Sequence, residues 1–225
     1  PTLVVMERAL AQLADHFPSR EPRAIGQRVV HGGDRFAGPA LIDEDVLAAI
    51  EALIPLAPLH QPKSVSLIQA LRQLHPDVAQ IACFDTAFHR TQPDLVRRFA
   101  LPRALFDAGV KRFGFHGLSY QYIAAELERR RPELARARVV VAHLGAGASL
   151  CALEGGVSRD TTMGFSTLDG VPMATRSGAI DPGVLLHLMR ADGMTAESLE
   201  HTLYHRSGLL GLSGISGDTR LLAES

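Results

Sequence analysis

The sequence has 225 residues and a formal net charge of −1, with 46% hydrophobic and 21% charged residues. This length allows one large domain or two small ones with a real core. The balanced charge and the short apolar runs argue against nucleic-acid and membrane partners. The N-terminus has no signal-peptide pattern, and two distant cysteines in apolar segments indicate a reducing, cytoplasmic compartment.

The first part of the chain is expected to alternate between helices and strands. In chain order we expect a helix over 5–17, a strand within 24–33, a helix capped by Asp43 and reaching residue 54, a proline-rich loop over 55–64, a helix capped by Ser64 or Ser66 and ending near Pro76, and a buried strand over 78–84. Asp85 follows that last strand.

The second part repeats the alternation. In order we expect a short strand over 110–115, a helix over 116–131, an apolar strand over 138–144, strands over 148–153 and 157–162 joined by a turn at Gly155 and Gly156, a helix opening at Asp181 and Pro182, and two more helical stretches. Alternation of this kind predicts the α/β class. We expect an N-terminal α/β domain over 1–88 and a C-terminal α/β domain over 89–225.

A glycine turn lies in "VVVAHLGAGASLCALEGG", residues 139–156. A dinucleotide-binding loop needs a third glycine and a following helix, and a Walker A loop needs Gly-Lys-Ser/Thr; neither pattern is present here. What remains is a β-hairpin whose backbone N–H groups can face an anion. Taken alone, this stretch favours an ordinary hairpin over a phosphate site.

Eight segments occur in a fixed order and together resemble the acetate kinase family, which phosphorylates short carboxylates from ATP. They are "RVVHGG" (28–33), "LAPLHQP" (56–62), "FDTAFH" (84–89), "GFHGLSY" (114–120), "HLGAGASLCA" (143–152), "RDTTMGF" (159–165), "ATRSGAIDPG" (174–183) and "SGISGDTR" (213–220).

The resemblance implies a two-domain, actin-like ATPase (ribonuclease H-like) fold with nucleotide in the cleft. It covers the central portion of a family chain, so we expect a fold incomplete at both ends, without the family's first glycine-serine turn and without most of its adenosine-binding half. ATP is the implied co-substrate. The ligands of the implied Mg²⁺ are expected from absent segments, with no metal ligand in this sequence, and the family pattern implies a cytoplasmic homodimer.

The resemblance also assigns roles to charged residues. Arg28 matches the carboxylate binder, and Arg176 and His116 match stabilisers of the transferring phosphoryl group. Alone, either arginine would be interpreted as a surface salt bridge, and the histidine as a helix cap. The family treats the position of Asp85 as essential and acid–base-like. Because acetate is already ionised at neutral pH, we expect Asp85 mainly to orient Arg28 or Mg²⁺-bound water.

The remaining assignments concern the acyl pocket and the nucleotide. The matched acyl pocket consists of Val30, Leu59, Phe115 and Thr167, with Thr167 in place of a family proline. The matched nucleotide-binding turn consists of His143, Leu144, Gly145, Ala146 and Gly147. His31 and His60 occupy family histidine positions, where a structural and a chemical role remain equally open. Ala146, Leu118 and Tyr120 replace polar residues of the family pattern.

The function predicted from these residues is reversible phosphorylation of acetate to acetyl phosphate by ATP. This chain alone is expected to be inactive. Two alternatives remain: a propionate or butyrate kinase, and a truncated, non-catalytic remnant that binds anions or a partner.

Overall fold

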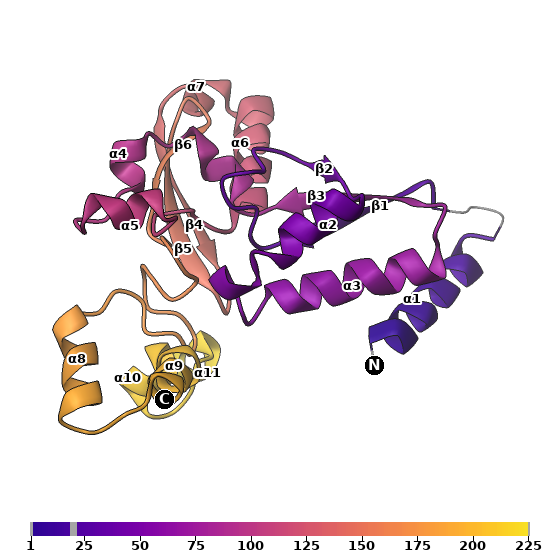
Figure 1. The fold of residues 1–225 in the computed structure, drawn as a ribbon. Coiled ribbons are helices and arrows are strands. Elements are labelled where there is room, and N and C mark those ends of the chain that lie inside the picture. The colour runs from indigo at the N-terminus through magenta and orange to yellow at the C-terminus, as the bar shows by residue number, and fades with distance from the viewer. Residues whose placement is uncertain (1, 19–21, 225) are drawn as a thin grey trace. The chain divides into compact units, whose positions relative to one another are not determined.

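The computed structural model describes residues 2–18 and 22–224. The chain divides into two compact units, Pro1–Arg90 and Thr91–Ser225 (Figure 1). Each unit contains one small β-sheet with helices packed around it.

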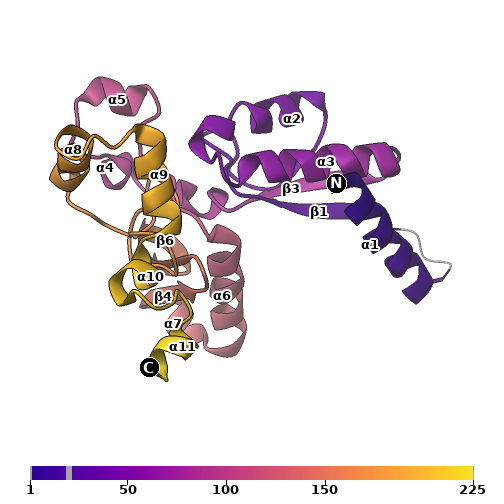
Figure 2. The ribbon, with the colours of Figure 1, turned by 90° about the horizontal axis from the view of Figure 1, so that it is seen from below.

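The first unit is built on a three-stranded sheet of order β1-β3-β2. Strand β1 (Ala24–Val29) runs parallel to β3 (Ala79–Phe84), and the short β2 (Ala40–Leu41) pairs antiparallel with β3. Helices α2 (Glu44–Glu51) and α3 (Gln61–Leu74) lie on one face of the sheet, as Figure 2 shows. The other helical segments are α1 (Thr2–His16), which contacts α3, and the 3₁₀ turns η1 (Ile54–Leu56) and η2 (Ala87–Thr91).

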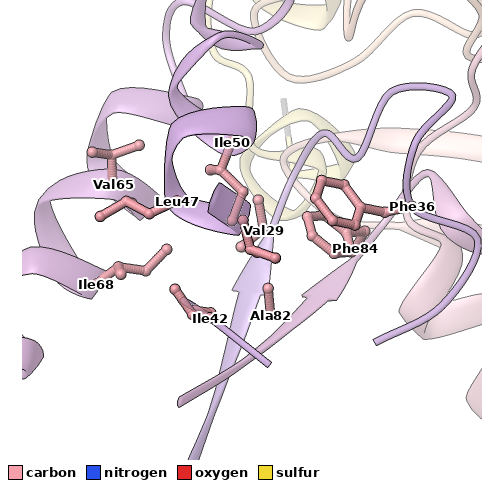
Figure 3. Packing of buried hydrophobic residues seen from close by; sticks show 10 residues of the cluster. Val29, Phe36, Ile42, Leu47, Ile50, Val65, Ile68, Ala82 and Phe84 are labelled. Carbon is pink, nitrogen blue, oxygen red and sulfur yellow. The ribbon is translucent and has the colours of Figure 1, made fainter. Parts of the chain in front are cut away.

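The core of this unit fills the space between the sheet and its two helices (Figure 3). Val29 and Phe84 come from the parallel strands, while Ile50 and Ile68 come from α2 and α3, and all four side chains are essentially inaccessible to solvent. The Phe84 ring stacks on that of Phe36 with 4.4 Å between centroids. Burial of aliphatic side chains on this scale contributes about 1.5–3 kcal/mol each, so this cluster fixes the edge of the sheet from which Arg28 and Asp85 extend.

The second unit is built on an antiparallel sheet of order β4-β5-β6. Its strands are β4 (Arg138–Leu144), β5 (Ala148–Glu154) and β6 (Val157–Thr161), with a register shift in the β5–β6 pairing at Ala152 and Leu153. The long helix α6 (Gly117–Arg130) contacts β4, and Figures 1 and 2 agree in placing it beside the sheet. The shorter helices are α4 (Asp94–Arg97), α5 (Arg103–Asp107), α7 (Pro132–Ala135), α8 (Pro182–Arg190), α9 (Ala196–His205), α10 (Gly208–Ser213) and α11 (Thr219–Ala223).

Local sequence signals predicted most of these elements correctly. The expected caps are confirmed, because the Asp43 carboxylate accepts from the Val46 N–H and the Asp181 carboxylate accepts from the Gly183 N–H. Helix α1 ends at His16, close to the expected position, and the strands expected over 78–84, 138–144, 148–153 and 157–162 are present within a residue or two.

Three expectations were wrong. Helix α3 begins at Gln61 with Pro62 in its first turn, so neither Ser64 nor Ser66 caps it, and residues 61–64 of the expected proline-rich loop are helical. The segment 110–115 is not a strand, because the N–H groups of Phe113 and Gly114 both donate to the Gly164 carbonyl instead of to a sheet neighbour. After α8 the described chain forms three helices, α9 to α11, where two were expected.

Within the described ranges, none of the helices combines the length and the apolar character needed to cross a bilayer. The thiols of Cys83 and Cys151 are both free, and burial raises the pKa of Cys151 to about 11.

Candidate active site

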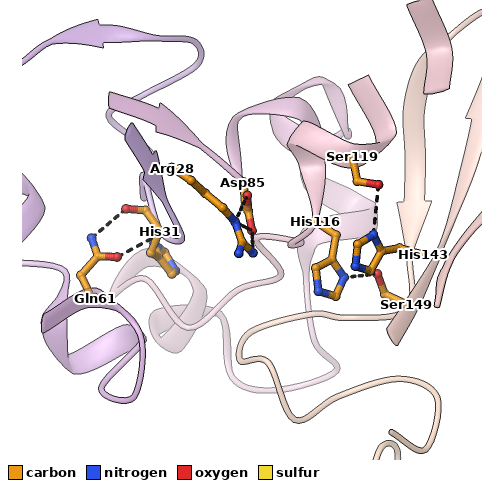
Figure 4. Close-up of polar contacts among 8 residues, drawn as sticks. All are labelled: Arg28, His31, Gln61, Asp85, His116, Ser119, His143 and Ser149. Carbon is orange, nitrogen blue, oxygen red and sulfur yellow. Dashed lines mark hydrogen bonds and ion pairs between the residues drawn. The ribbon is translucent and has the colours of Figure 1, made fainter. Parts of the chain in front are cut away.

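In the first unit, Arg28 and Asp85 form an ion pair at one edge of the sheet (Figure 4). Arg28 lies in β1 and Asp85 directly follows β3, and because these strands are parallel, their carboxyl ends meet at the same edge. The Asp85 N–H donates to the Val29 carbonyl at 3.0 Å, which continues the ladder by one residue. The pairing of β1 with β3 therefore brings together two residues that are 57 positions apart in sequence.

The geometry of this pair is specific. Arg28 Nη2 donates to Asp85 Oδ2 at 2.6 Å, and Arg28 Nε lies 3.1 and 3.2 Å from the two carboxylate oxygens. The Asp85 side chain is 1% exposed, whereas that of Arg28 is 58% exposed. The hydrogen bond from Arg28 to Asp85 raises the pKa of the arginine. Asp85 thus anchors a guanidinium whose remaining N–H donors face solvent, where they can bind an anion.

His31 is held rigidly in the same unit. Gln61 clamps its backbone, accepting from the His31 N–H at 3.2 Å and donating to the His31 carbonyl at 3.0 Å (Figure 4). The His31 Nδ1 accepts from the Gly33 N–H at 3.0 Å. Burial lowers the pKa of His31 to about 4, so the ring is neutral at physiological pH. Of the two interpretations left open by the sequence, these contacts support the structural one.

In the second unit, His116 precedes α6 with an unusual backbone. Its φ is 59°, in the left-handed region that non-glycine residues seldom adopt and that costs about 1–2 kcal/mol. The side chain makes no capping hydrogen bond to the helix; instead Nδ1 lies 2.8 Å from Ser149 Oγ. The interpretation of His116 as a helix cap is therefore wrong, and the strained backbone directs the ring toward β5.

His116 and His143 form a stacked pair. Their ring centroids are 4.1 Å apart with an interplanar angle of 20°. Each ring uses Nδ1 to contact a serine hydroxyl, Ser149 for His116 and Ser119 for His143, the latter at 3.0 Å (Figure 4). Two imidazoles from different elements are thus fixed side by side at the end of β4.

The glycine turn between β4 and β5 lies directly beside His116 and Arg176. The Gly145 N–H donates to the Gly147 carbonyl at 3.1 Å, which closes the turn. A Cβ atom added at Gly147 would lie 2.7 Å from Arg176 Nη2 and 3.4 Å from His116 Nε2. Because Gly147 has no side chain, Arg176 and His116 can approach the turn closely. Three residues singled out from the sequence therefore lie together here.

Arg176 is held by the loop on which it lies. Its Nη1 donates to the Thr167 carbonyl at 2.7 Å. Burial lowers the pKa of Arg176, yet an arginine stays charged at any physiological pH. A half-buried, oriented guanidinium is suited to contact an anion in a partly desolvated position.

A cavity of about 820 Å³ adjoins the glycine turn. It is lined by the turn residues Leu144, Gly145, Ala146 and Ala148, by Pro172, Met173 and Ala174 before Arg176, and by Leu209, Gly217, Asp218, Thr219 and Arg220. The Asp218 carboxylate is paired with Arg220 at 2.7 Å. The segments 143–152, 174–183 and 213–220 of the sequence comparison thus line one hollow within this unit.

The residues matched to the acyl pocket belong to different units. Val30 and Leu59 lie in the first, where Val30 is buried and Leu59 is partly exposed. Phe115 and Thr167 are buried in the second. The pocket that the four would form stays a prediction.

The described residues do not form a magnesium site on their own. Across 2–18 and 22–224, no cluster of three or more His, Cys, Asp or Glu side chains is arranged to hold a metal ion. Both carboxylate oxygens of Asp85 accept from Arg28. In the part of the chain that the structure describes, the residues present therefore do not fit a resident Mg²⁺ by themselves.

The sequence analysis missed two buried polar residues of the site, Gln61 and Ser149. Both side chains are completely inaccessible to solvent. Ser149 could have been found from the alternation of β5, in which residues 149, 151 and 153 point inward. Gln61 left no such signal, because its segment was interpreted as a loop.

Solved structures of two kinases of short carboxylic acids share this mixed α/β fold. Acetate kinase from Porphyromonas gingivalis is 38% identical with a TM-score of 0.90, over 99% of this chain and 57% of that one. A propionate kinase from Francisella tularensis is also 38% identical, with a TM-score of 0.93 over 99% of this chain and 58% of that one. The chain therefore has the mixed α/β fold of these two structures and matches somewhat more than half of each.

The chain matches the model of the acetokinase family over residues 4–225 and belongs to that family. It is 51% identical to acetate kinase of Methylocella silvestris over 217 residues, and 54% identical to acetate kinase of Rhodopseudomonas palustris (strain TIE-1) over 210 residues. These matches cover 96% and 93% of the chain but only 54% and 53% of the relatives. The chain thus spans about half the length of the curated relatives it matches, toward their N-terminal portion rather than their centre, which corrects the expectation of a central portion.

Proposed function

We propose that a protein of full family length containing this chain transfers the γ-phosphoryl group of ATP to acetate, reversibly forming acetyl phosphate. The observation that carries the proposal is the convergence of Arg176 Nη2 and His116 Nε2 on Gly147. Phosphoryl transfer proceeds through a loose transition state with charge on three equatorial oxygens, and catalysis consists mainly of positioned donors. Two cationic or polar donors beside a glycine turn and a cavity suit that chemistry.

The acceptor needs no general base. A short carboxylic acid has a pKa near the value of about 4.3 for a glutamate side chain, so it is a carboxylate at neutral pH. Its oxygen attacks the γ-phosphorus, the bond to the bridging oxygen of ADP breaks, and the electron pair stays on ADP. Arg28 binds the acetate carboxylate with the donors that Asp85 leaves unused, and Asp85 orients Arg28 without taking a proton.

The family uses ATP and Mg²⁺, and Mg²⁺ supplies charge neutralisation on the phosphates when bound. In our proposal Arg176 and His116 donate to the equatorial oxygens, while the turn at Gly145 and Gly147 faces the nucleotide phosphates. His143 supports His116 by stacking. We further propose that the full-length protein acts in the cytoplasm as a homodimer and that this chain alone is inactive, since about half of the family length is absent from it.

Propionate kinase is the second candidate activity. It is favoured by the similarity to the propionate kinase from F. tularensis, whose structure matches as well as that of an acetate kinase. Thr167, at the position of a family proline, is the residue of this chain that bears on the choice.

The test is ATP-dependent acyl phosphate formation by a full-length protein carrying this chain, with acetate, propionate and butyrate as acceptors. Hydroxylamine trapping measures the product. Arg176→Ala should lower turnover by about a hundredfold, the scale for loss of one donor to developing charge. Arg138→Ala is the matched control, because Arg138 is exposed and pairs only on the surface with Glu154. Absence of acyl phosphate with all three acids would reject the proposal. ADP binding without turnover would then identify the protein as an anion-binding remnant.

A further inference from the structure

Two hydroxyl groups, those of Ser149 and Tyr120, lie behind His116, and the reaction proposed above does not use them. Tyr120 lies one turn into α6 and its side chain is completely buried. Its hydroxyl lies 2.5 Å from Ser149 Oγ. The same Ser149 oxygen lies 2.8 Å from His116 Nδ1. Ser149 therefore bridges the tyrosine and the histidine.

The number of hydrogens restricts how this chain can be arranged. A serine hydroxyl has one hydrogen to donate, and so has a tyrosine hydroxyl. Burial raises the pKa of Tyr120 to about 12, so its proton stays on at neutral pH. The Tyr120 oxygen also accepts a hydrogen bond from the His143 backbone, which favours Tyr120 as the donor to Ser149. The serine hydrogen then goes to His116 Nδ1, and that nitrogen is an acceptor.

We propose that Tyr120 and Ser149 are positioning residues that place the single proton of neutral His116 on Nε2. The proposal rests on the function proposed above for its consequence, but the proton position itself is a property of this chain. Nε2 is the nitrogen that faces Gly147 and Arg176. With the proton there, the ring donates to a phosphate oxygen at the turn; with the proton on Nδ1, it would present a lone pair to that oxygen and repel it.

His143 and Ser119 form a second contact between an imidazole and a serine hydroxyl, which serves as an internal comparison. His143 Nδ1 contacts Ser119 Oγ at 3.0 Å. Ser119 is partly exposed, whereas Ser149 is fully buried and bound by Tyr120. The buried network is therefore expected to set the tautomer of His116 more strictly than Ser119 sets that of His143.

Long-range ¹⁵N–¹H NMR of the imidazole rings tests the proposal directly on this chain without substrate. Spectra are recorded at alkaline pH, raised until the imidazole signals no longer change with pH. His116→Gln assigns the His116 signals by their loss. The variants are Ser149→Ala and Tyr120→Phe, each of which removes one oxygen. The controls are Tyr122→Phe on the exposed side of α6, and Ser119→Ala, which removes the hydroxyl next to His143.

We expect the Nε2–H pattern for His116 in the wild type and in both controls. Ser149→Ala and Tyr120→Phe should shift it toward a mixture of tautomers, while Ser119→Ala should alter the His143 signals only. An Nδ1–H pattern in the wild type would overturn the proposal, and an unchanged pattern in Tyr120→Phe would overturn the part assigned to Tyr120. If the full-length protein makes no acyl phosphate, the proposed function is rejected, but the spectra of this chain are unaffected. Failure of the proposed function and failure of the proposed proton position can therefore be told apart.

Discussion

The Arg28 guanidinium is anchored by the buried Asp85 carboxylate through three contacts of 2.6–3.2 Å, although Arg28 itself is mostly exposed. The buried partner fixes the direction of the exposed one. In the proposed function Asp85 acts on the acceptor through Arg28, and an acid–base role is not needed for an acceptor that is already a carboxylate.

Asp85→Asn should weaken acetate binding more than it slows the chemical step. An amide replaces one accepting oxygen with a donor that opposes the guanidinium, and a lost charge-assisted hydrogen bond is worth about 1.5–3 kcal/mol. In the full-length protein we expect KM for acetate to rise at least about tenfold with a smaller change in KM for ATP. Asp34→Asn, which removes the surface partner of Arg90, is the matched control. A shifted Mg²⁺ dependence with unchanged KM for acetate would assign Asp85 to the metal instead.

Gly147→Ala should impair turnover without unfolding the protein. The new Cβ would meet the flexible end of Arg176, so the guanidinium moves while the backbone stays. Displacement of a catalytic donor by about 1 Å can cost about a hundredfold in rate. Gly145→Ala, whose nearest contact is the Gly147 carbonyl at 3.3 Å, should have a smaller effect on kcat. Equal kcat values in the two variants, with unchanged circular dichroism spectra, would mean that the close approach of Arg176 to Gly147 does not matter for turnover.

The sequence predicted the elements whose signals are local. The caps at Asp43 and Asp181 and the alternation in β5 each depend on neighbours within a few residues, and all three are confirmed. The segment 110–115 misled, because the N–H groups of Phe113 and Gly114 donate to the Gly164 carbonyl, about 50 residues further on, and not to a neighbouring strand. Pairing at such a distance leaves no periodic pattern in the segment itself.

The sequence proposed the residues of the candidate site but did not show how their side chains contact one another. Motif matching singled out Arg28, Asp85, His116 and Arg176 as residue types suited to phosphate chemistry. Sequence reasoning expected Asp85 to orient either Arg28 or Mg²⁺-bound water, and only the pairing of β1 with β3 shows its contact with Arg28. The contacts of Ser149, which depend on the register of β4 with β5, were missed. Contacts that depend on strand register can be recognised only once the strands are paired in the sheet.

His31 should make stability depend on pH below neutrality. Its pKa of about 4 in the folded chain is lower than the ordinary value of about 6.5, so the unfolded chain binds the proton more readily. Stability is therefore complete above about pH 6.5 and is lost as the pH falls toward 4, with a loss of about 2 kcal/mol between about pH 7 and pH 5. Urea unfolding at both pH values measures it. The loss should shrink in His31→Asn and persist in the control His201→Asn, an exposed position; the same slope in all three proteins would contradict the assignment.

Gly208→Ala should destabilise the second unit through the loop that carries Arg176. Gly208 has φ +61°, and a Cβ there would lie 2.1 Å from the Met173 carbonyl oxygen and 2.6 Å from that of Arg176. Both contacts are with backbone, so the loop must shift. Gly193→Ala is the matched control, with φ +67° and open space around the added carbon. The control isolates the cost of left-handed φ, about 1 kcal/mol, and Gly208→Ala should lose at least about 2 kcal/mol more in chemical unfolding. Equal losses of unfolding free energy in the two variants would mean that the close contact of residue 208 with the Met173 and Arg176 carbonyls does not affect stability.

Thr167→Pro should narrow acceptor choice toward acetate. In the structure Thr167 is buried and its carbonyl accepts from Arg176 at 2.7 Å. A proline has the same carbonyl acceptor, although it loses the N–H and fixes φ. We therefore expect kcat with acetate to change little. One methylene in an apolar pocket is worth about 1–3 kcal/mol of discrimination, so a threonine wall should leave acetate and propionate within about tenfold of each other, and proline should widen that ratio several-fold.

Competition between the two acids in one reaction measures the ratio of kcat/KM values for the wild type, Thr167→Pro and Thr167→Val. The valine variant keeps the branched shape but removes the hydroxyl, so it separates the effect of losing the hydroxyl from the effect of the rigid proline ring. If the acetate-to-propionate ratio of kcat/KM widens only in Thr167→Pro, the effect comes from the fixed φ of proline. An unchanged ratio in both variants would show that Thr167 does not line the acyl pocket. An equal fall in kcat for both acids would instead place its effect on Arg176, through the carbonyl that holds the guanidinium.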